Sequence, residues 1–433
     1  MSDLIWVTDT CNNLKLIKHS KPKACTNVFN ALTNFYEKQK QNFDFIIKNP
    51  EKYYENQLYS AKNGVGHTFI PKTGQNHPWF AHTRLESTGL YLQTACELIA
   101  DGFQGKPYGY KSFSEIPKNV LETISNITKY LKSINYPKAP SCGAWEENTF
   151  INSLTSDTSV INEGFRKLLK LVYSPTKDKN LSEFRNALLK TQHGDVFKDK
   201  EALFKLLKSG EQRIEDIHYT ESIKADFKAE FDWQKKCLGR KSDSAMAFVP
   251  QTETLNKNSI VGDAIAKIGI LRQLERDLVR ENGAIRYKND EYLNLDYHKL
   301  KNQWDDNKKQ NEAEWFLVSE ISKGYGKIVE NILNSTNEKV ANEKIKKILN
   351  FALKKETEYI NRSYARITPK NMTKSNNYSC PAYKIPEAYE AVTTKNGIKY
   401  VPGAHTPLTW AEASLFEASE LFLKNLQKIE QLS

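Results

Sequence analysis

Residues 141–174 read SCGAWEENTFINSLTSDTSVINEGFRKLLKLVYS, a polar loop with a tryptophan and two glutamates, followed by an amphipathic segment. Apolar residues recur at helical spacing over residues 160–174, which predicts a helix there. The same pattern predicts further helices at 87–103, 182–192, 200–210, 259–283, 313–335, 343–365 and 406–432. We therefore expect an all-α fold.

Long polar loops rich in aromatic residues separate these helices. They span 63–84, 135–148, 283–314 and 376–407. Long ordered loops in compact proteins tend to carry function. No linker rich in Pro, Gly or Ser divides the chain, so the loop–helix alternation predicts one domain over residues 1–433, an (α/α)6 toroid whose alternate loops build a pocket.

The composition suits a globular protein and is rich in aromatic residues. Hydrophobic residues make up 39% and charged residues 27% of the 433, with 21 Tyr, 20 Phe and 7 Trp. Carbohydrate and nucleic-acid sites both use aromatic faces. The net charge of +11 comes from lysines scattered over polar helix faces, which favours a solubilising surface. We expect no nucleic-acid partner. The alternative is a helical protein that binds nucleic acid, and strong, salt-sensitive binding to RNA or DNA would support it.

The sequence favours a protein without a metal, a cofactor or a membrane span. Its six cysteines form no CxxC pair, and its acidic residues form no calcium loop. No apolar run reaches the length of about 18 residues that a membrane helix needs. The start, MSDLIWVTDTCNN, lacks the regions of a signal peptide, which predicts a cytoplasmic location. The oligomeric state leaves no mark in the sequence.

Two loop glutamates are candidates for acid–base chemistry. Glu146 directly follows Trp145, and an indole beside a carboxyl group can desolvate it, which raises its pKa and keeps a proton available. Glu387 follows Pro386 in a tyrosine-rich loop. Inverting glycosidases use such a pair, about 6.5–9.5 Å apart, to protonate the leaving oxygen and to activate water. The alternatives are a helix-start charge for Glu146 and a surface acid for Glu387.

The ordered set of motifs resembles the glucoamylase family, glycoside hydrolase family 15, and especially its branch related to the phosphorylase kinase α subunit. The motifs are CGAWEENTF, TSDTSVINEGFRKLL, IRYKNDEY, EAEWFLVSEI and IPEAYEAV…HTPLTWAEASLF, within roughly residues 60–428. The resemblance implies an (α/α)6 toroid that hydrolyses α-glucosidic bonds of a glucan, an oligosaccharide or a disaccharide with inversion. A non-catalytic glucan-binding or regulatory module is the rival interpretation.

The resemblance also implies roles for individual residues. Glu146 matches the general acid and Glu387 the general base. The residues implied to contact the sugar are Trp145, Glu147, Arg286, Trp315, Trp79 and Tyr389. Two of these have a simpler explanation, because Arg286 could pair with Asp290 and Trp315 could be a core residue.

One motif departs from the family pattern. The family grips the terminal sugar with an Arg-Asp pair in a Trp-x-Arg-Asp context. Here Trp6 and Asp9 fit that context, but Thr8 occupies the arginine position, and the first outer helix would be missing or replaced. Arg84, followed by Glu86, is the other candidate for this role. Asp9 and Arg84 are therefore both candidate sugar-binding residues.

Overall fold

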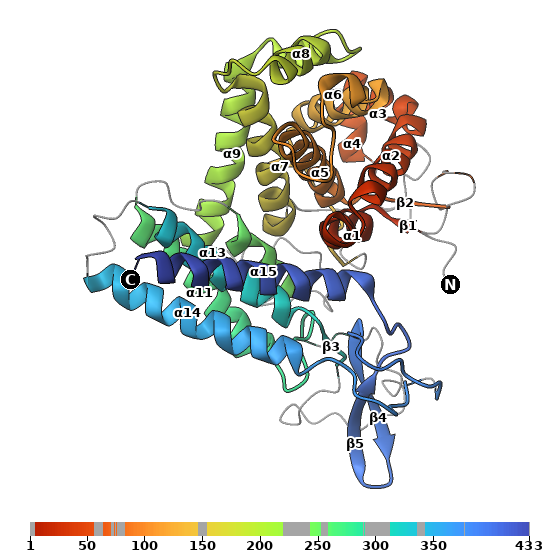
Figure 1. Cartoon of the computed structure of the whole chain (residues 1–433). Helices are drawn as coiled ribbons and strands as arrows, with labels where there is room; N and C mark the ends of the chain where they lie inside the picture. The colour runs from red at the N-terminus through yellow and green to blue at the C-terminus, as the bar shows by residue number, and fades with distance from the viewer. Residues whose placement is uncertain are drawn as a thin grey trace. The chain divides into compact units, whose positions relative to one another are not determined.

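A computed structural model describes residues 5–55, 64–70, 73, 75, 83–145, 154–219, 243–252, 259–288, 290, 312–335, 343–375 and 377–432. Two compact units divide the chain, Met1–Glu230 and Phe231–Ser433. Both consist mainly of helices (Figure 1). The single domain over residues 1–433 stays a prediction.

The first unit is a helical assembly with one short strand pair. Its elements are β1 (Ile5–Trp6), α1 (Val7–Ser20), α2 (Pro22–Lys38), α3 (Lys40–Lys48), α4 (Glu51–Glu55), β2 (Thr68–Phe69), α5 (Leu85–Phe103), η1 (Phe113–Glu115), α6 (Lys118–Ser133), α7 (Thr155–Tyr173), α8 (Lys179–Leu188), η2 (Gly194–Phe197) and α9 (Lys200–Tyr219). The strands pair antiparallel, with Trp6 opposite Thr68.

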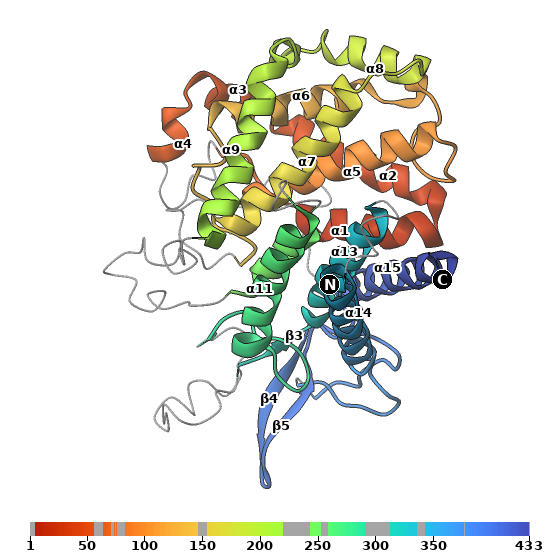
Figure 2. The ribbon, with the colours of Figure 1, turned by 90° about the vertical axis from the view of Figure 1, so that its left-hand side faces the viewer.

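Helices α5 and α7 pack against each other closely in this unit (Figure 2). A Cβ atom at Gly164 of α7 would lie 2.6 Å from the backbone oxygen of Gly89 on α5. Real Cβ atoms do not approach a backbone oxygen that closely, so glycine is required at this crossing. The packing places Gly89, near the start of α5, beside Ile161 and Gly164 of α7.

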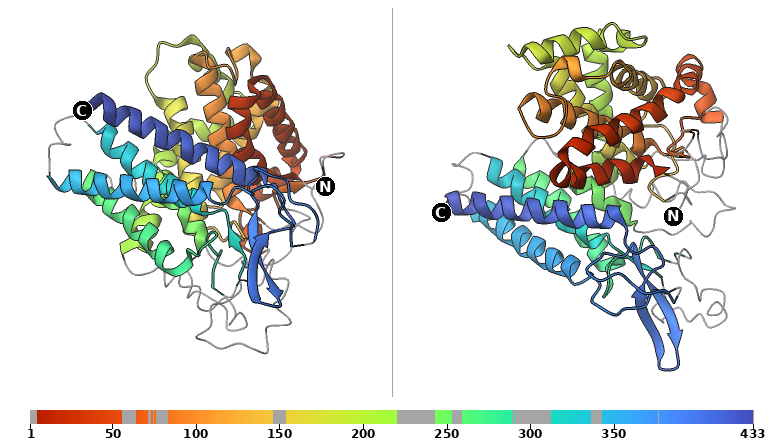
Figure 3. Two further views of the ribbon diagram at one scale, coloured as in Figure 1. Left: turned by 60° about the horizontal axis from the view of Figure 1, so that its bottom comes forward. Right: turned by 45° about the vertical axis from the view of Figure 1, so that its right-hand side comes forward.

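In its described residues, the second unit combines four long helices with a small sheet. Its elements are η4 (Ser244–Gln251), α11 (Ile260–Leu278), β3 (Glu314–Trp315), α13 (Val318–Asn334), α14 (Glu343–Tyr364), β4 (Ala388–Thr394), β5 (Gly397–Pro402) and α15 (Thr409–Leu432). Helix α13 contacts α11, α14 and α15 and is buried along most of its length (Figure 3). It forms the core of this unit.

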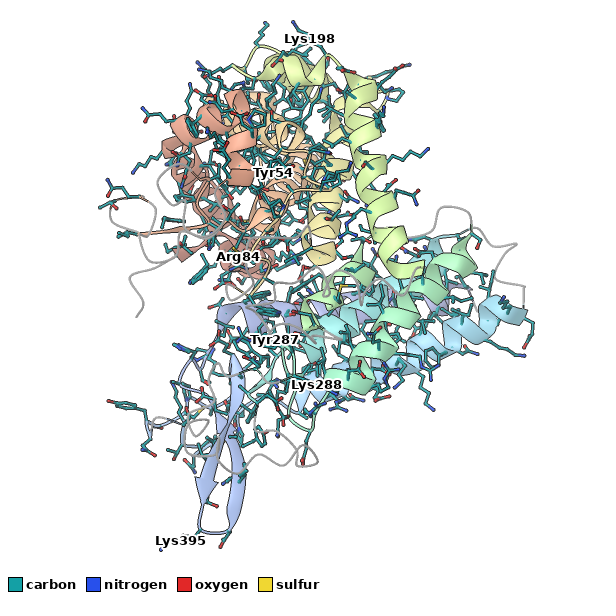
Figure 4. The ribbon with its side chains drawn as sticks, turned by 180° about the vertical axis from the view of Figure 1, so that it is seen from behind. Tyr54, Arg84, Lys198, Tyr287, Lys288 and Lys395 are labelled. Carbon is teal, nitrogen blue, oxygen red and sulfur yellow. The ribbon has the colours of Figure 1, made fainter. Side chains whose placement is uncertain are left out.

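The hairpin β4–β5 differs from the loop expected at 376–407. Its strands pair from Tyr389 opposite Pro402 to Thr394 opposite Gly397, and Lys395 lies at its tip (Figure 4). Asn396-Gly397 in the turn is a strong hairpin signal that the sequence interpretation did not use. Strand β4 also pairs with β3, so the hairpin fixes the position of the segment before it, which ends in Glu387.

Helix lengths and composition bear on the membrane prediction. Within the part of the chain that the structure describes, no helix combines the length and the hydropathy that a bilayer span requires.

Candidate active site

Short backbone ladders in the second unit bring three distant segments side by side. Trp315 exchanges two hydrogen bonds with Ala284, with N···O distances of 2.8 and 3.0 Å. Trp315 is also the register partner of Ala388 in the β3–β4 pair. The segments that carry Arg286, Trp315 and Glu387 therefore meet at one edge of the small sheet.

Arg286 is a buried cation between a carboxylate and an aromatic ring. Its Nε and Nη2 atoms donate to the two carboxylate oxygens of Asp290, each over 2.6 Å. Its Cζ atom lies 4.8 Å from the ring centroid of Trp315. The ion pair considered in the sequence is thus present, and the same guanidinium stacks on another candidate residue. A bidentate pair of this kind fixes the plane of the guanidinium.

Glu387 has a fixed backbone and a half-buried position. Its N–H donates to the carbonyl of His405 over 3.1 Å, and its own carbonyl accepts from Phe316 N over 3.2 Å. Tyr389, two residues later, is buried, and its hydroxyl donates to the carbonyl of Arg366 over 3.2 Å. Burial raises the pKa of Tyr389, so its hydroxyl remains a donor at neutral pH.

In the first unit, Arg84 lies beside Trp6 and Thr8 of the Trp-x-Arg-Asp context. The Cζ atom of Arg84 lies 5.6 Å from the ring centroid of Trp6. Arg84 Nε donates to Glu86 Oε1 over 2.6 Å, and the Thr8 hydroxyl donates to the same oxygen over 3.4 Å. Arg84 lies at the start of α5 (Figure 4). It therefore shares the Glu86 carboxylate with Thr8, the residue at the arginine position of the motif. Asp9 follows Thr8 in the first turn of α1 and is half-buried.

The loop that leads to the candidate acid is anchored by a buried serine. The Ser141 hydroxyl accepts from Leu85 N over 3.2 Å and from Gly143 N over 3.3 Å, and it donates to Asp157 Oδ2. Burial, with the nearby Glu86 carboxylate adding to it, raises the pKa of Asp157 well above its ordinary value. Trp145, in the same loop, is only 3% exposed.

Part of the predicted site lies outside the described residues: Glu146, Glu147 and Trp79. In the second unit the structure assembles Arg286, Trp315, Glu387 and Tyr389. In the first unit Asp9 lies in the first turn of α1, Arg84 directly precedes α5, and Trp145 lies in the loop of Ser141. In the described part of the chain, no three His, Cys, Asp or Glu side chains are grouped so that they could hold a metal ion.

Sequence reasoning missed the residues that support these segments. Asp157 lies in the Ser- and Thr-rich start of α7, where a first-turn acid is usually a simple helix-start charge. The signal that could have identified Asp157 is its position in the sequence shortly after the loop of Ser141, with which it forms a hydrogen bond. Glu314 lies in the motif EAEWFLVSEI but was not assigned a role, and Arg366 lies in none of the motifs.

Comparison with known proteins supports the fold. No protein-family model matches the chain, and no curated protein matches it. A solved glycosidase in complex with glucose is similar, with a TM-score of 0.54 at 10% identity over 97% of this chain and 88% of that one. A wild-type glycosidase gives the same values. The glucoamylase of Saccharomycopsis fibuligera has a TM-score of 0.53 at 12% identity over 98% and 86%. At such identities the likeness concerns the fold alone, and it confirms the predicted all-α class, the (α/α)6 toroid of the glucoamylase type.

Proposed function

We propose that the protein is a glycoside hydrolase that cleaves α-glucosidic bonds with inversion of the anomeric centre. The observation that carries the proposal is the assembly of Arg286, Trp315, Glu387 and Tyr389 from three separate segments of the second unit. These four residues were chosen from sequence motifs, and the fold has the glucoamylase type. The substrate class is an α-linked glucan, an oligosaccharide or a disaccharide.

Two carboxyl groups supply the chemistry of the proposed reaction. The Glu146 carboxyl gives its proton to the glycosidic oxygen as the bond to the anomeric carbon breaks. The Glu387 carboxylate accepts a proton from water as the water oxygen bonds to that carbon from the opposite face. One water is consumed, and the new hemiacetal has the β configuration. The buried indole of Trp145 supports a desolvated, protonated Glu146.

Arg84 is proposed to replace the arginine that the Trp-x-Arg-Asp motif lacks at position 8. The support is its place over Trp6 and its shared partner with Thr8, the carboxylate of Glu86. In this proposal the guanidinium of Arg84 and the carboxylate of Asp9 together bind the hydroxyl groups of the terminal sugar. The arginine then comes from the start of α5 instead of from α1.

The rival function is a glucan-binding module without catalysis. The double hydrogen bond between Arg286 and Asp290 favours it, because this guanidinium already has an acceptor within the protein. The replacement of the motif arginine by Thr8 also favours it. Retention of both Glu146 and Glu387 favours the hydrolase.

The test is glucose release from maltose, maltotriose, maltoheptaose, isomaltose and trehalose, with the product anomer read by NMR. Wild type is compared with Glu146→Gln and Glu387→Gln. Glu343→Gln is the matched control, because Glu343 is an exposed glutamate in the first turn of α14. The hydrolase predicts β-glucose from the wild type and the control and at least a ~10²-fold loss of rate in both glutamine variants. Sugar binding that quenches tryptophan fluorescence, without cleavage, would establish the binding module instead.

A further inference from the structure

Arg366 is a buried cation that no sequence motif identified. It lies two residues beyond the end of α14 at Tyr364, and only 3% of its surface is exposed. Arginine is almost never buried this fully unless its charge is compensated. Burial lowers the pKa of Arg366 to about 10, so the guanidinium is still charged at neutral pH.

The partners of this guanidinium are backbone carbonyls. Its Nη1 atom donates to the carbonyl of Asn282 and, over 3.2 Å, to that of Glu314. Its Nη2 atom makes a longer contact of 3.5 Å with the carbonyl of Pro386. Among the described residues, no carboxylate forms an ion pair with Arg366. The charge is therefore compensated by the carbonyl groups of three chain segments, together with the nearby carboxylate of Glu314.

These segments are the ones that carry the candidate site residues of the second unit. Asn282 lies in the loop that leads to Arg286, Glu314 directly precedes Trp315, and Pro386 directly precedes Glu387. The carboxylate of Glu314 also accepts from Asn282 N over 2.5 Å, which ties two of the segments together a second time. Arg366 thus lies where the backbones of all three segments converge.

The surroundings of the guanidinium are shaped to hold it in place. A Cβ atom at Gly283 would lie 2.2 Å from Nη1 of Arg366 and 2.4 Å from the carbonyl oxygen of Trp315. Glycine is therefore needed beside the guanidinium. The ring centroid of Tyr389 lies 5.1 Å from Cζ of Arg366, so an aromatic ring packs near the cation.

We propose that Arg366 is a positioning residue, whose guanidinium sets the placement of Glu387 relative to Arg286 and Trp315 by bonding the carbonyl groups of their segments. The proposal rests on the proposed function, in which Glu387 activates the attacking water. A planar guanidinium can reach several acceptors in one plane, whereas an ammonium group is a point charge. Lysine at position 366 would therefore release at least one of the three segments.

The experiment compares Arg366→Lys with the matched control Arg362→Lys. Arg362 belongs to the last turn of α14 and donates to the carbonyl of Arg280, so it contacts only the segment of Arg286 and neither of the segments that carry Phe316 and Glu387. Amide hydrogen exchange is measured at Phe316 and Glu387, whose N–H groups make the hydrogen bonds that hold Glu387, and at Val329 in α13. We expect exchange at Phe316 and Glu387 to become about tenfold faster in Arg366→Lys and to stay unchanged at Val329 and in the control.

The kinetic readout uses the α-glucoside that the wild type cleaves. A misplaced base lowers kcat by about 10²-fold while KM changes little, since small misplacements of reacting groups slow the chemical step. Added guanidinium ion should partly restore kcat to Arg366→Ala. Unchanged exchange at Phe316 and Glu387 would overturn the proposal, and so would equal loosening of Val329, which indicates a general role in folding.

The outcomes separate this proposal from the proposed function. If the wild type cleaves no glucoside, the proposed function fails, and the exchange measurement alone decides whether Arg366 positions Glu387. If Arg366→Lys does not fold, Arg366→Gln provides the same test, because its neutral amide has a single NH2 donor group in place of the guanidinium. Wild-type exchange at Phe316 and Glu387 in that variant would likewise overturn the proposal.

Discussion

Two buried polar centres, one in each unit, hold the segments that lead to the two candidate glutamates, and they use opposite chemistry. In the first unit Ser141 and the carboxyl group of Asp157 anchor the loop before Glu146. In the second unit the guanidinium of Arg366 holds the segment before Glu387. Both centres bind backbone groups, one chiefly through N–H donors and the other through carbonyl acceptors.

The difference lies in how each centre responds to pH. Burial raises the pKa of Asp157, so its stable buried form is the neutral acid. Arg366 remains charged, because burial lowers its pKa only to about 10. The two glutamate segments are therefore expected to loosen in different pH ranges, the first as pH rises through the raised pKa of Asp157 and the second only as pH approaches about 10, the pKa of Arg366.

Arg366→Ala should show the largest effect. It leaves three carbonyl groups, two of them in buried contacts and one part-buried, without this donor. Each unsatisfied buried group costs about 1–3 kcal/mol, so we expect a loss of about 3 kcal/mol or more in the free energy of unfolding. Urea unfolding of the full chain measures it. Arg362→Ala, which releases the single carbonyl of Arg280, should lose less, and an equal loss would mean that the three-segment arrangement has no special weight.

The pH dependence of stability should show an intermediate effect. Because the folded state keeps the Asp157 proton above the ordinary pKa of 3.8, the unfolded chain binds fewer protons there, and the Asp157 contribution to stability falls as pH rises. The slope is at most about 1.4 kcal/mol per pH unit. Urea unfolding at several pH values between about 4 and 7 should show wild type losing stability relative to Asp157→Asn, whose side chain does not titrate. A constant difference between the two proteins would contradict the raised pKa.

The smallest effect concerns the side chain at position 157 at low pH. The Ser141 hydroxyl accepts from Leu85 and Gly143 and donates to Asp157, with the carbonyl of Thr83 as a more distant acceptor at 3.4 Å. An asparagine oxygen at position 157 can accept the same hydrogen bond. At about pH 4 we expect Asp157→Asn to cost under ~1 kcal/mol and Asp157→Ala about 1–2 kcal/mol. Hydrogen exchange at Leu85 and Gly143 reports the local loosening, and equal exchange in the two variants would show that Asp157 does not hold the serine.

Sequence patterns located α5, α7, α8, α9 and the long helices of the second unit, but they missed α1, α2, α3, α4 and α6 as well as the small sheet. The helix expected at 87–103 lies within α5, and the one expected at 160–174 coincides with all but the first turn of α7. The helix expected at 313–335 begins instead with strand β3 and becomes helical at Val318. Helical periodicity is a local signal, whereas a strand of two residues is defined only by its partner in β4.

The sequence by itself determined the all-α class and the order of the candidate residues, because periodicity and short motifs are properties of neighbouring positions. Only the tertiary structure decided which of those residues meet. It placed Arg84 beside the motif of Trp6, and it joined the segments of Arg286, Trp315 and Glu387. Arg366 shows the physical reason most clearly. Its hydrogen-bond partners are backbone carbonyls, which every residue has, so no pattern of side chains in the sequence predicts its burial.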